Sequence, residues 1–150
     1  MSTEEVRTHS ALHVLKGAVQ KTLGASLTTS TFARGGHGRL TVRFDRSPTP
    51  EEEAEIERLT NQKVAEGVEM IEFEMEKEEA EAHFGDTIYD LFPIPPEVTR
   101  LKIVRIADWN VNCCAERHVE NTSLIGKIRL GKIRFRNSRK EIEMDFDLAS

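Results

Sequence analysis

Two pairs of potential metal ligands constrain this chain more than any other feature. His9 and His13 are four residues apart within a helical pattern, and Cys114 and His118 have the same spacing in the last third of the sequence. Residues at positions i and i+4 project from one face of a helix, so each pair can hold one ion. Three imidazoles and a thiolate are a suitable ligand set for zinc. If all four bind one ion, distant parts of the chain must meet at one point.

The number of ligands bears on the role of such an ion. Four protein ligands close a tetrahedral zinc site, which is typical of structural zinc, whereas catalytic zinc keeps a position for water or substrate. Two alternatives stay open. One residue, with His118 as the first candidate, is an exchangeable ligand, or the substrate expands the coordination. The zinc-protease motif H-E-x-x-H is excluded because Ser10 follows His9.

Composition favours a soluble globular protein. The chain has 150 residues, of which 38% are hydrophobic and 31% charged, enough for one domain with a core, expected to cover residues 1–150. We expect a cytoplasmic protein without membrane contact, because no apolar stretch is long enough to span a bilayer and the first residues are polar. Because Cys113 and Cys114 are adjacent, the sequence does not favour a disulfide framework.

Local signals predict three helices. Thr8 or Ser10 would cap the first helix, since both precede an apolar periodic run. Thr49 and Glu52 form a capping box at the start of a second helix that should lie on the surface. A short third helix is expected over residues 77–84.

Alternation of apolar and polar residues predicts the strands. They are expected at residues 26–34, 40–45, 71–76, 101–107, 128–136 and 141–148. A glycine-rich turn at residues 35–38 would join the first two as a hairpin, and 101–107 should be a central strand. Because helices and strands are interleaved without a regular βαβ rhythm, the sequence predicts an α+β fold, a mostly antiparallel sheet with helices packed against it.

Basic residues recur along the penultimate strand. At a spacing of mostly two residues, much of the charge would lie on one strand face. A solvated sheet surface and a phosphate-binding stripe are both compatible with this pattern, and tRNA binding is the sharper hypothesis. The residues are Lys127, Arg129, Lys132, Arg134 and Arg136.

Several motifs together resemble the editing domain of alanyl-tRNA synthetase and its free-standing short relatives, the AlaX proteins. The resemblance covers roughly residues 6–136. Its marks are Arg7-Thr8-His9-Ser10-Ala11-Leu12-His13, Val42-Arg43-Phe44-Asp45, Thr49-Pro50-Glu51-Glu52 with Ile56-Glu57 and Asn61, Glu79-Ala80, Phe84-Gly85, and Asp108-Trp109-Asn110-Val111-Asn112-Cys113-Cys114-Ala115-Glu116-Arg117-His118.

The resemblance implies a single two-layer editing-type domain with a buried N-terminal helix. It also implies a hydrolase that cleaves serine, and possibly glycine in addition, from mischarged tRNA(Ala). Carried over, His9, His13, Cys114 and His118 are the zinc ligands and active-site residues. The expected partner is the acceptor end of mischarged tRNA(Ala), bound by a monomer or a weak homo-oligomer. One departure is Ala115-Glu116-Arg117, where the synthetases have Gly-Gly-Thr, which should let this segment turn more like a helix.

Selectivity for serine over alanine requires a partner for one hydroxyl group. Thr29 and Thr31 are candidates, because alternation sends both to one face of the first strand. The glycine motif of the family is represented by Gly35 and Gly36, which are further candidates for substrate binding.

Two other functions fit the same residues. One is a non-catalytic RNA-binding module stapled by zinc, and the other is a zinc hydrolase for a different small ester or amide. An open metal position beside a pocket for a small amino acid would favour the editing hydrolase over the binding module.

Overall fold

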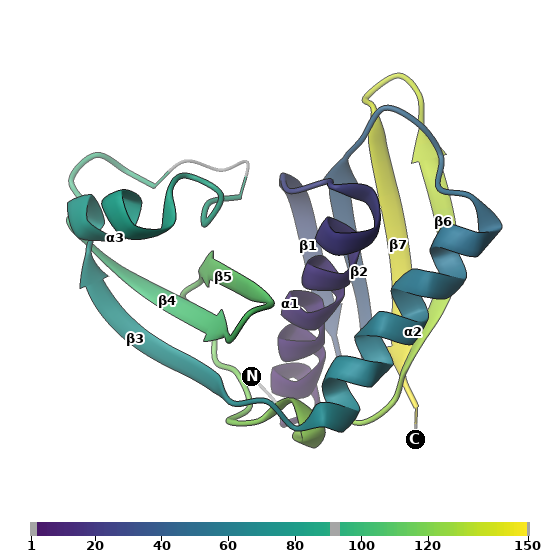
Figure 1. The fold of residues 1–150 in the computed structure, drawn as a ribbon, viewed down its shortest axis with the longest axis horizontal. Helices are drawn as coiled ribbons and strands as arrows, with labels where there is room; N and C mark the ends of the chain where they lie inside the picture. The colour runs from purple at the N-terminus through teal and green to yellow at the C-terminus, as the bar shows by residue number, and fades with distance from the viewer. Residues whose placement is uncertain (1–2, 91–93, 150) are drawn as a thin grey trace.

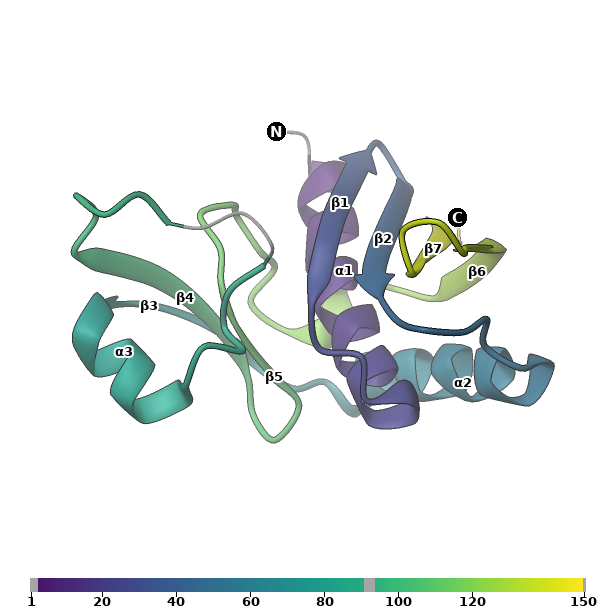
Figure 2. The same ribbon diagram turned by 90° about the horizontal axis from the view of Figure 1, so that it is seen from above.

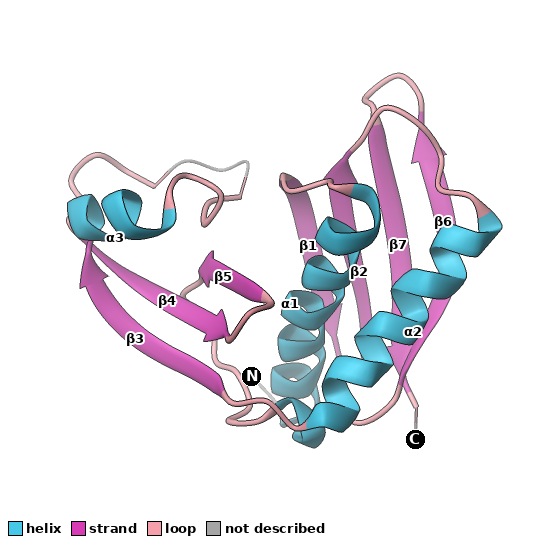
Figure 3. Ribbon diagram, in the orientation of Figure 1, coloured by secondary structure: helices cyan, strands magenta, loops and turns pink. Residues whose placement is uncertain are grey.

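A computed structural model describes residues 3–90 and 94–149 of the chain (Figures 1 and 3). Its helices and strands are α1 (Thr3–Leu23), β1 (Thr28–Arg34), β2 (His37–Arg43), α2 (Pro50–Glu66), β3 (Met70–Glu76), α3 (Lys77–Phe84), β4 (Arg100–Ile106), β5 (Asn110–Cys113), the 3₁₀ helix η1 (Thr122–Leu124), β6 (Ile128–Arg136) and β7 (Glu141–Leu148). Among these residues no helix has the length and apolar character needed to cross a membrane.

The strands form two antiparallel sheets, which confirms the predicted α+β class. The larger sheet has the order β1-β2-β7-β6, and the smaller has the order β3-β4-β5. The expected hairpin is β1 and β2, and β4 is the central strand of its sheet, as predicted. β7, the last strand in sequence, lies between β2 and β6.

Helix α1 stands between the two sheets, as both views show (Figures 1 and 2). Every residue from Ser10 to Val19 is buried. Such a helix has no solvent-facing stripe, which is typical of a core helix. Leu15 and Val19 pack in the main core with residues of the larger sheet, including Phe146. The burial of the N-terminal helix is therefore confirmed, and this one helix lies between the two sheets.

The predicted start of α1 is wrong. The helix begins at Thr3, and neither Thr8 nor Ser10 is a cap. Ser10 Oγ instead donates to the carbonyl four residues earlier, Val6 O, at 2.7 Å, and Thr8 Oγ1 lies 3.0 Å from Glu4 O and 2.6 Å from Gly35 O. Serine and threonine inside helices commonly satisfy their hydroxyls in this way. The capping prediction is correct for α2, where both hydrogen bonds of the Thr49–Glu52 box are present.

Trp109 fixes the position of the smaller sheet against α1. Its indole packs on Gly17, where an added Cβ would lie 2.2 Å from Nε1. The same Nε1 donates to Val14 O at 3.0 Å, and the ammonium groups of Lys21 and Lys63 lie over the ring. A glycine is required here for contact, since any side chain would displace the ring.

Candidate metal centre and active site

The structure brings the four predicted ligands together. The ligand atoms of His9, His13, Cys114 and His118 all lie within 4.8 Å of one another. His9 Nε2 is 3.3 Å from Cys114 Sγ, and the ring centroids of His13 and His118 are 4.6 Å apart. Donors of a tetrahedral zinc site are separated by about 3.3 to 3.6 Å, given zinc bonds of ~2.0–2.3 Å. We call these four residues the His/Cys cluster.

The two halves of the cluster are held differently. His9 and His13 project from one face of α1, as their spacing predicts. Cys114 and His118 lie in irregular chain after β5, so the expectation of a helix-like turn there is wrong. Backbone groups of this loop have distant partners instead of helical ones: Cys114 N donates to Lys102 O and Val119 N to Ser10 Oγ.

His118 is oriented by a carboxylate. Its Nδ1 donates to Glu72 Oε2 on β3 at 2.7 Å, and Lys102 Nζ lies 3.0 Å from the same oxygen. A carboxylate on the far nitrogen is the usual second partner of a metal-binding histidine, because it fixes the tautomer and the ring. This contact was not predicted, since Glu72 is one of many acids on an alternating strand.

Two nitrogen atoms of the cluster are buried without a hydrogen-bond partner among the described residues. They are His13 Nδ1 and His118 Nε2. Leaving a buried polar atom unpaired is costly, so such atoms favour binding of a ligand at this place. Together with the nitrogen and sulfur donor set, they show that these residues fit a metal ion; zinc suits the set but is not identified by it.

Burial keeps the cluster uncharged. It lowers the pKa of His9 to about 4, with a further contribution from His118. Burial also lowers the pKa of His13, and it lowers that of His118 against the opposing effect of Glu72. Burial raises the pKa of the Cys114 thiol to about 11. Near neutral pH the cluster thus presents three neutral imidazoles and a thiol, and neutral imidazole is the form that binds metals.

A small pocket, here called the inner pocket, opens beside the cluster. It contains three of the cluster residues and reaches both sheets. Its lining is His9, Leu12, His13, Lys16, Thr28, Thr31, Leu40, Asp90, Asn112 and Cys114.

Thr28, which sequence reasoning missed, is the threonine buried in the inner pocket. Its Oγ1 has no hydrogen-bond partner within the described parts of the chain. Thr31 also lines this pocket, but Thr29 does not, and its Oγ1 is 3.4 Å from Thr41 O. The reason is a register irregularity between Thr28 and Ser30, which interrupts the alternation on which the prediction rested.

Gly35 and Gly36 lie in the β1–β2 turn and not in the lining of the inner pocket. Gly35 has φ +55°, a backbone conformation that favours glycine. Its carbonyl accepts from Thr8 Oγ1 at 2.6 Å, which ties the turn to α1 one residue before His9. The position suits support of the cluster, while their role in substrate binding stays a prediction.

A second opening, here called the outer pocket, shares His9 and Thr31 with the inner pocket. Its lining is Glu5, His9, Thr31, Phe32, Ala33 and Glu116. The two pockets therefore adjoin at Thr31 and at His9, one of the cluster residues.

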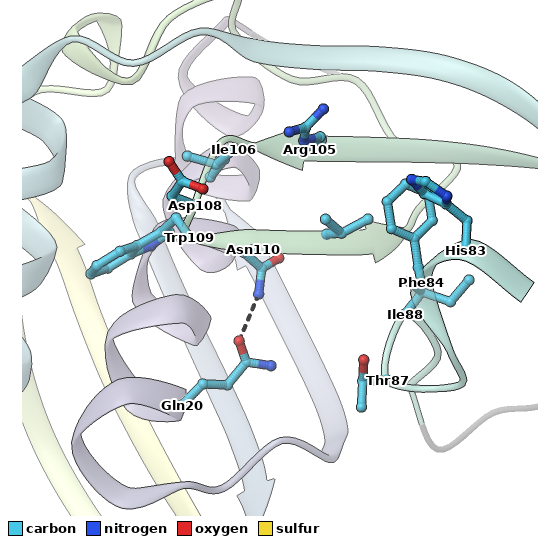
Figure 4. Close-up of a pocket in the computed structure, with 11 residues that line it drawn as sticks. Gln20, His83, Phe84, Thr87, Ile88, Arg105, Ile106, Asp108, Trp109 and Asn110 are labelled. Carbon is cyan, nitrogen blue, oxygen red and sulfur yellow. Dashed lines mark hydrogen bonds between the residues drawn. The ribbon is translucent and has the colours of Figure 1, made fainter. Parts of the chain in front are cut away.

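A third pocket lies further along α1 (Figure 4). It contains Gln20, whose Oε1 accepts from Asn110 Nδ2 at 3.0 Å, and the aromatic Phe84 and Trp109. None of the four cluster residues lines it. It therefore lacks the chemistry of the inner pocket and is not our candidate active site.

The basic residues on and beside β6 are placed away from the cluster. β6 is the edge strand opposite β1 in the larger sheet. Arg134 pairs with Glu143 at 3.2 Å and Asp145 at 3.5 Å, and Arg136 pairs with Glu143 at 3.3 Å. These acids of β7 neutralise part of the stripe. Binding of tRNA phosphates by this strand stays a prediction.

Sequence comparison finds relatives among alanine–tRNA ligases. The chain is 33% identical to the enzyme of Thermococcus kodakarensis over 128 residues and 35% identical to that of Hyperthermus butylicus over 127 residues. These alignments cover 85% and 83% of the chain but 14% of each relative. No family model matches the chain. The resemblance predicted from the motifs is confirmed: the chain is a homologue of one segment of the alanine–tRNA ligases.

Proposed function

We propose that this chain is an editing hydrolase that removes serine, and glycine to an extent still to be measured, from mischarged tRNA(Ala). Residues 1–150 form its editing domain, and zinc is the metal of the His/Cys cluster. The observation that carries the proposal is the convergence of His9, His13, Cys114 and His118 beside a small pocket, in a chain homologous to alanine–tRNA ligases.

An aminoacyl ester is activated, so the barrier to its hydrolysis is modest. The protein needs to position one water molecule and to stabilise a tetrahedral oxyanion. A bound zinc ion supplies positive charge and lowers the pKa of coordinated water towards ~7. The protein residues supply position. Glu72 orients His118, Ser10 Oγ accepts from Val119 N beside it, and α1 presents His9 and His13.

Thr28 is our candidate for recognition of the serine hydroxyl. An unpaired Oγ1 in the inner pocket gains a partner when a hydroxylated side chain enters and stays unpaired when alanine enters. A site that hydrogen-bonds a substrate hydroxyl can reject the analogue without it strongly, because the buried polar group of the protein is left unsatisfied.

The test is hydrolysis by the zinc-loaded protein of three substrates: Ser-tRNA(Ala), Ala-tRNA(Ala) and a simple serine ester. We expect only Ser-tRNA(Ala) to be deacylated rapidly. Equal attack on the simple ester would support a general esterase instead, and the absence of turnover on all three would contradict the proposal.

Selectivity gives a second test. The variant Thr28→Val should reduce the ratio of kcat/KM for serine over alanine by about 10-fold or more, since it removes one buried hydrogen bond. Thr29→Val is the matched control on the adjacent residue. The hypothesis drawn from strand alternation instead predicts a loss of selectivity in Thr29→Val or in Thr31→Val. If Thr28→Val keeps the full ratio, another residue recognises the hydroxyl.

A non-catalytic RNA-binding module stapled by zinc is the second candidate. One observation favours it: four donors are available to the ion and His118 is held by Glu72, which suits a closed structural site. The assay above separates it from editing, because this module would bind tRNA without deacylating it.

A further inference from the structure

A lysine and an aspartate meet inside the inner pocket. Lys16 belongs to the same face of α1 as His9 and His13, and only 4% of its surface is exposed. Its Nζ donates to Asp90 Oδ1 at 2.7 Å and also to Asn112 Oδ1. Asn112 Nδ2 in turn donates to Ile88 O, so the amide is fixed with its oxygen towards the lysine.

Fold stability alone gives little reason for this pair. Burial of the Lys16 charge carries a desolvation cost, and apolar residues of similar size are often as stable as a buried ion pair or more so. Both side chains nevertheless line the inner pocket, alongside His9, His13 and Cys114. A charged pair in the lining of the inner pocket points to a ligand that carries a charged group.

The aspartate is the more exposed end of this network, and it lines a neighbouring opening beside Leu27 and Tyr89 as well as the inner pocket. Its side chain keeps 35% of its surface exposed, against 5% for the lysine. Lys16 occupies Oδ1, and no hydrogen bond within the described parts of the chain engages Oδ2. Among the described residues that line the inner pocket, Asp90 is the one carboxylate.

We propose that Asp90 binds the α-ammonium group of the aminoacyl ester, with Lys16 and Asn112 as positioning residues. This inference rests on the proposed function. An ammonium donates charge-assisted hydrogen bonds to a carboxylate, and these are stronger than neutral ones. A protonated amine has no lone pair for a metal, so on this assignment the amino group is held by protein and the His/Cys cluster is left for the ester.

The other nearby acids are less suitable. Glu5 and Glu116 line the outer pocket but not the inner one. On this proposal the terminal nucleoside occupies the outer pocket and the amino acid occupies the inner one. Glu116 is therefore the matched control for Asp90.

The experiment compares Ser-tRNA(Ala) with N-acetyl-Ser-tRNA(Ala), which has no ammonium group. The wild-type protein should favour the free amine by about 10- to 100-fold in kcat/KM, the range expected for one hydrogen bond to a charged group. Asp90→Asn should lower activity on Ser-tRNA(Ala) and abolish the preference. Glu116→Gln should retain it.

A binding measurement separates this inference from catalysis. The probe is 3′-(L-seryl)amino-3′-deoxyadenosine, whose amide resists hydrolysis, and its N-acetyl derivative is the reference. Titration calorimetry should show about 10-fold or greater preference for the free amine with wild type, in zinc-loaded and zinc-free protein alike. Asp90→Asn should lose that preference while binding zinc as wild type does.

The outcomes distinguish the two proposals. If the wild type deacylates neither tRNA substrate, the proposed function fails. If it deacylates both tRNA substrates equally well, the editing proposal survives and the role of Asp90 is overturned. Loss of the preference in Glu116→Gln but not in Asp90→Asn would assign the ammonium to Glu116 and overturn the inference as well.

Discussion

At the scale of single residues, the candidate centre is a set of uncharged donors with unsatisfied atoms. Burial disfavours the charged form of every member, which lowers the imidazole pKa values and raises that of the thiol. A cation can therefore bind to the cluster without electrostatic repulsion from protonated histidines. The cost is that Cys114 must lose its proton when a metal binds.

This gives a prediction for zinc binding. At pH 7.5 the histidines are already neutral, because their pKa values are lowered, whereas Cys114, with a pKa of about 11, carries its proton. Zinc binding should therefore release about one proton per ion. Calorimetry in buffers of different ionisation enthalpy measures this number. Cys114→Ser should bind zinc more weakly, and release of two or more protons by wild type would show that histidines were protonated.

At the scale of elements, α1 is the part on which the site depends. Its residues reach the cluster, the inner pocket and the main core. Contact between Gly17 and Trp109 sets how closely the smaller sheet approaches it. The indole is fixed by its hydrogen bond to Val14 O and by two lysines, so it has little freedom to move aside.

The variant Gly17→Ala tests this contact. Alanine is the better helix former by about 1 kcal/mol, but its Cβ would lie 2.2 Å from Trp109 Nε1. Displacing the ring should outweigh the gain and destabilise the protein by about 2 kcal/mol in urea unfolding. Gly131→Ala is the control, since its Cβ would meet its nearest neighbour at 3.5 Å. A Gly17→Ala variant as stable as wild type would contradict the assigned packing.

Sequence reasoning succeeded where the signals are local. The start of α2 depends on Thr49, Pro50 and Glu52, which are near neighbours in sequence, and the His9–His13 spacing indicates one helix face. It failed where distant residues decide the conformation. The loop from 114 to 119 is held by hydrogen bonds to Ser10 and Lys102, and the loop sequence does not indicate either partner.

The same contrast between local signals and distant partners applies to the residues of the candidate site. All four cluster residues were identified, because a donor set with matched spacing carries chemical information. Thr28 was missed because one irregularity in β1 changes which threonine faces inward. Asp90 was missed because it lies outside the named helices and strands, where no periodicity indicates a facing partner.

At the scale of the whole molecule, the cluster joins two layers. His9 and His13 come from the helix that packs on the larger sheet, and Cys114 follows directly on β5 of the smaller one. A metal ion bound by all four residues would hold the layers together. The same ion would thus support folding as well as the proposed chemistry.

Removal of the metal should therefore lower thermal stability. With free zinc at about a thousand times its Kd, linkage gives about 4 kcal/mol of stabilisation, or a Tm higher by about 10 °C for a chain of this size. Calorimetric scans with zinc and with a chelator measure the difference. His13→Ala should show little response to the chelator. A wild-type Tm independent of zinc would exclude a joining role for the ion.

The central position of β7 has a consequence for synthesis. Residues 141–148 fill the place between β2 and β6, so the first hairpin can gain its inner neighbour only after nearly all the preceding chain has been made. Until then, the edge of β2 that later pairs with β7 is exposed to the solvent or to other molecules, and so is the apolar side of α1. A nascent chain therefore carries an unfinished sheet until β7 has been synthesised, which leaves it prone to aggregation or to capture by chaperones.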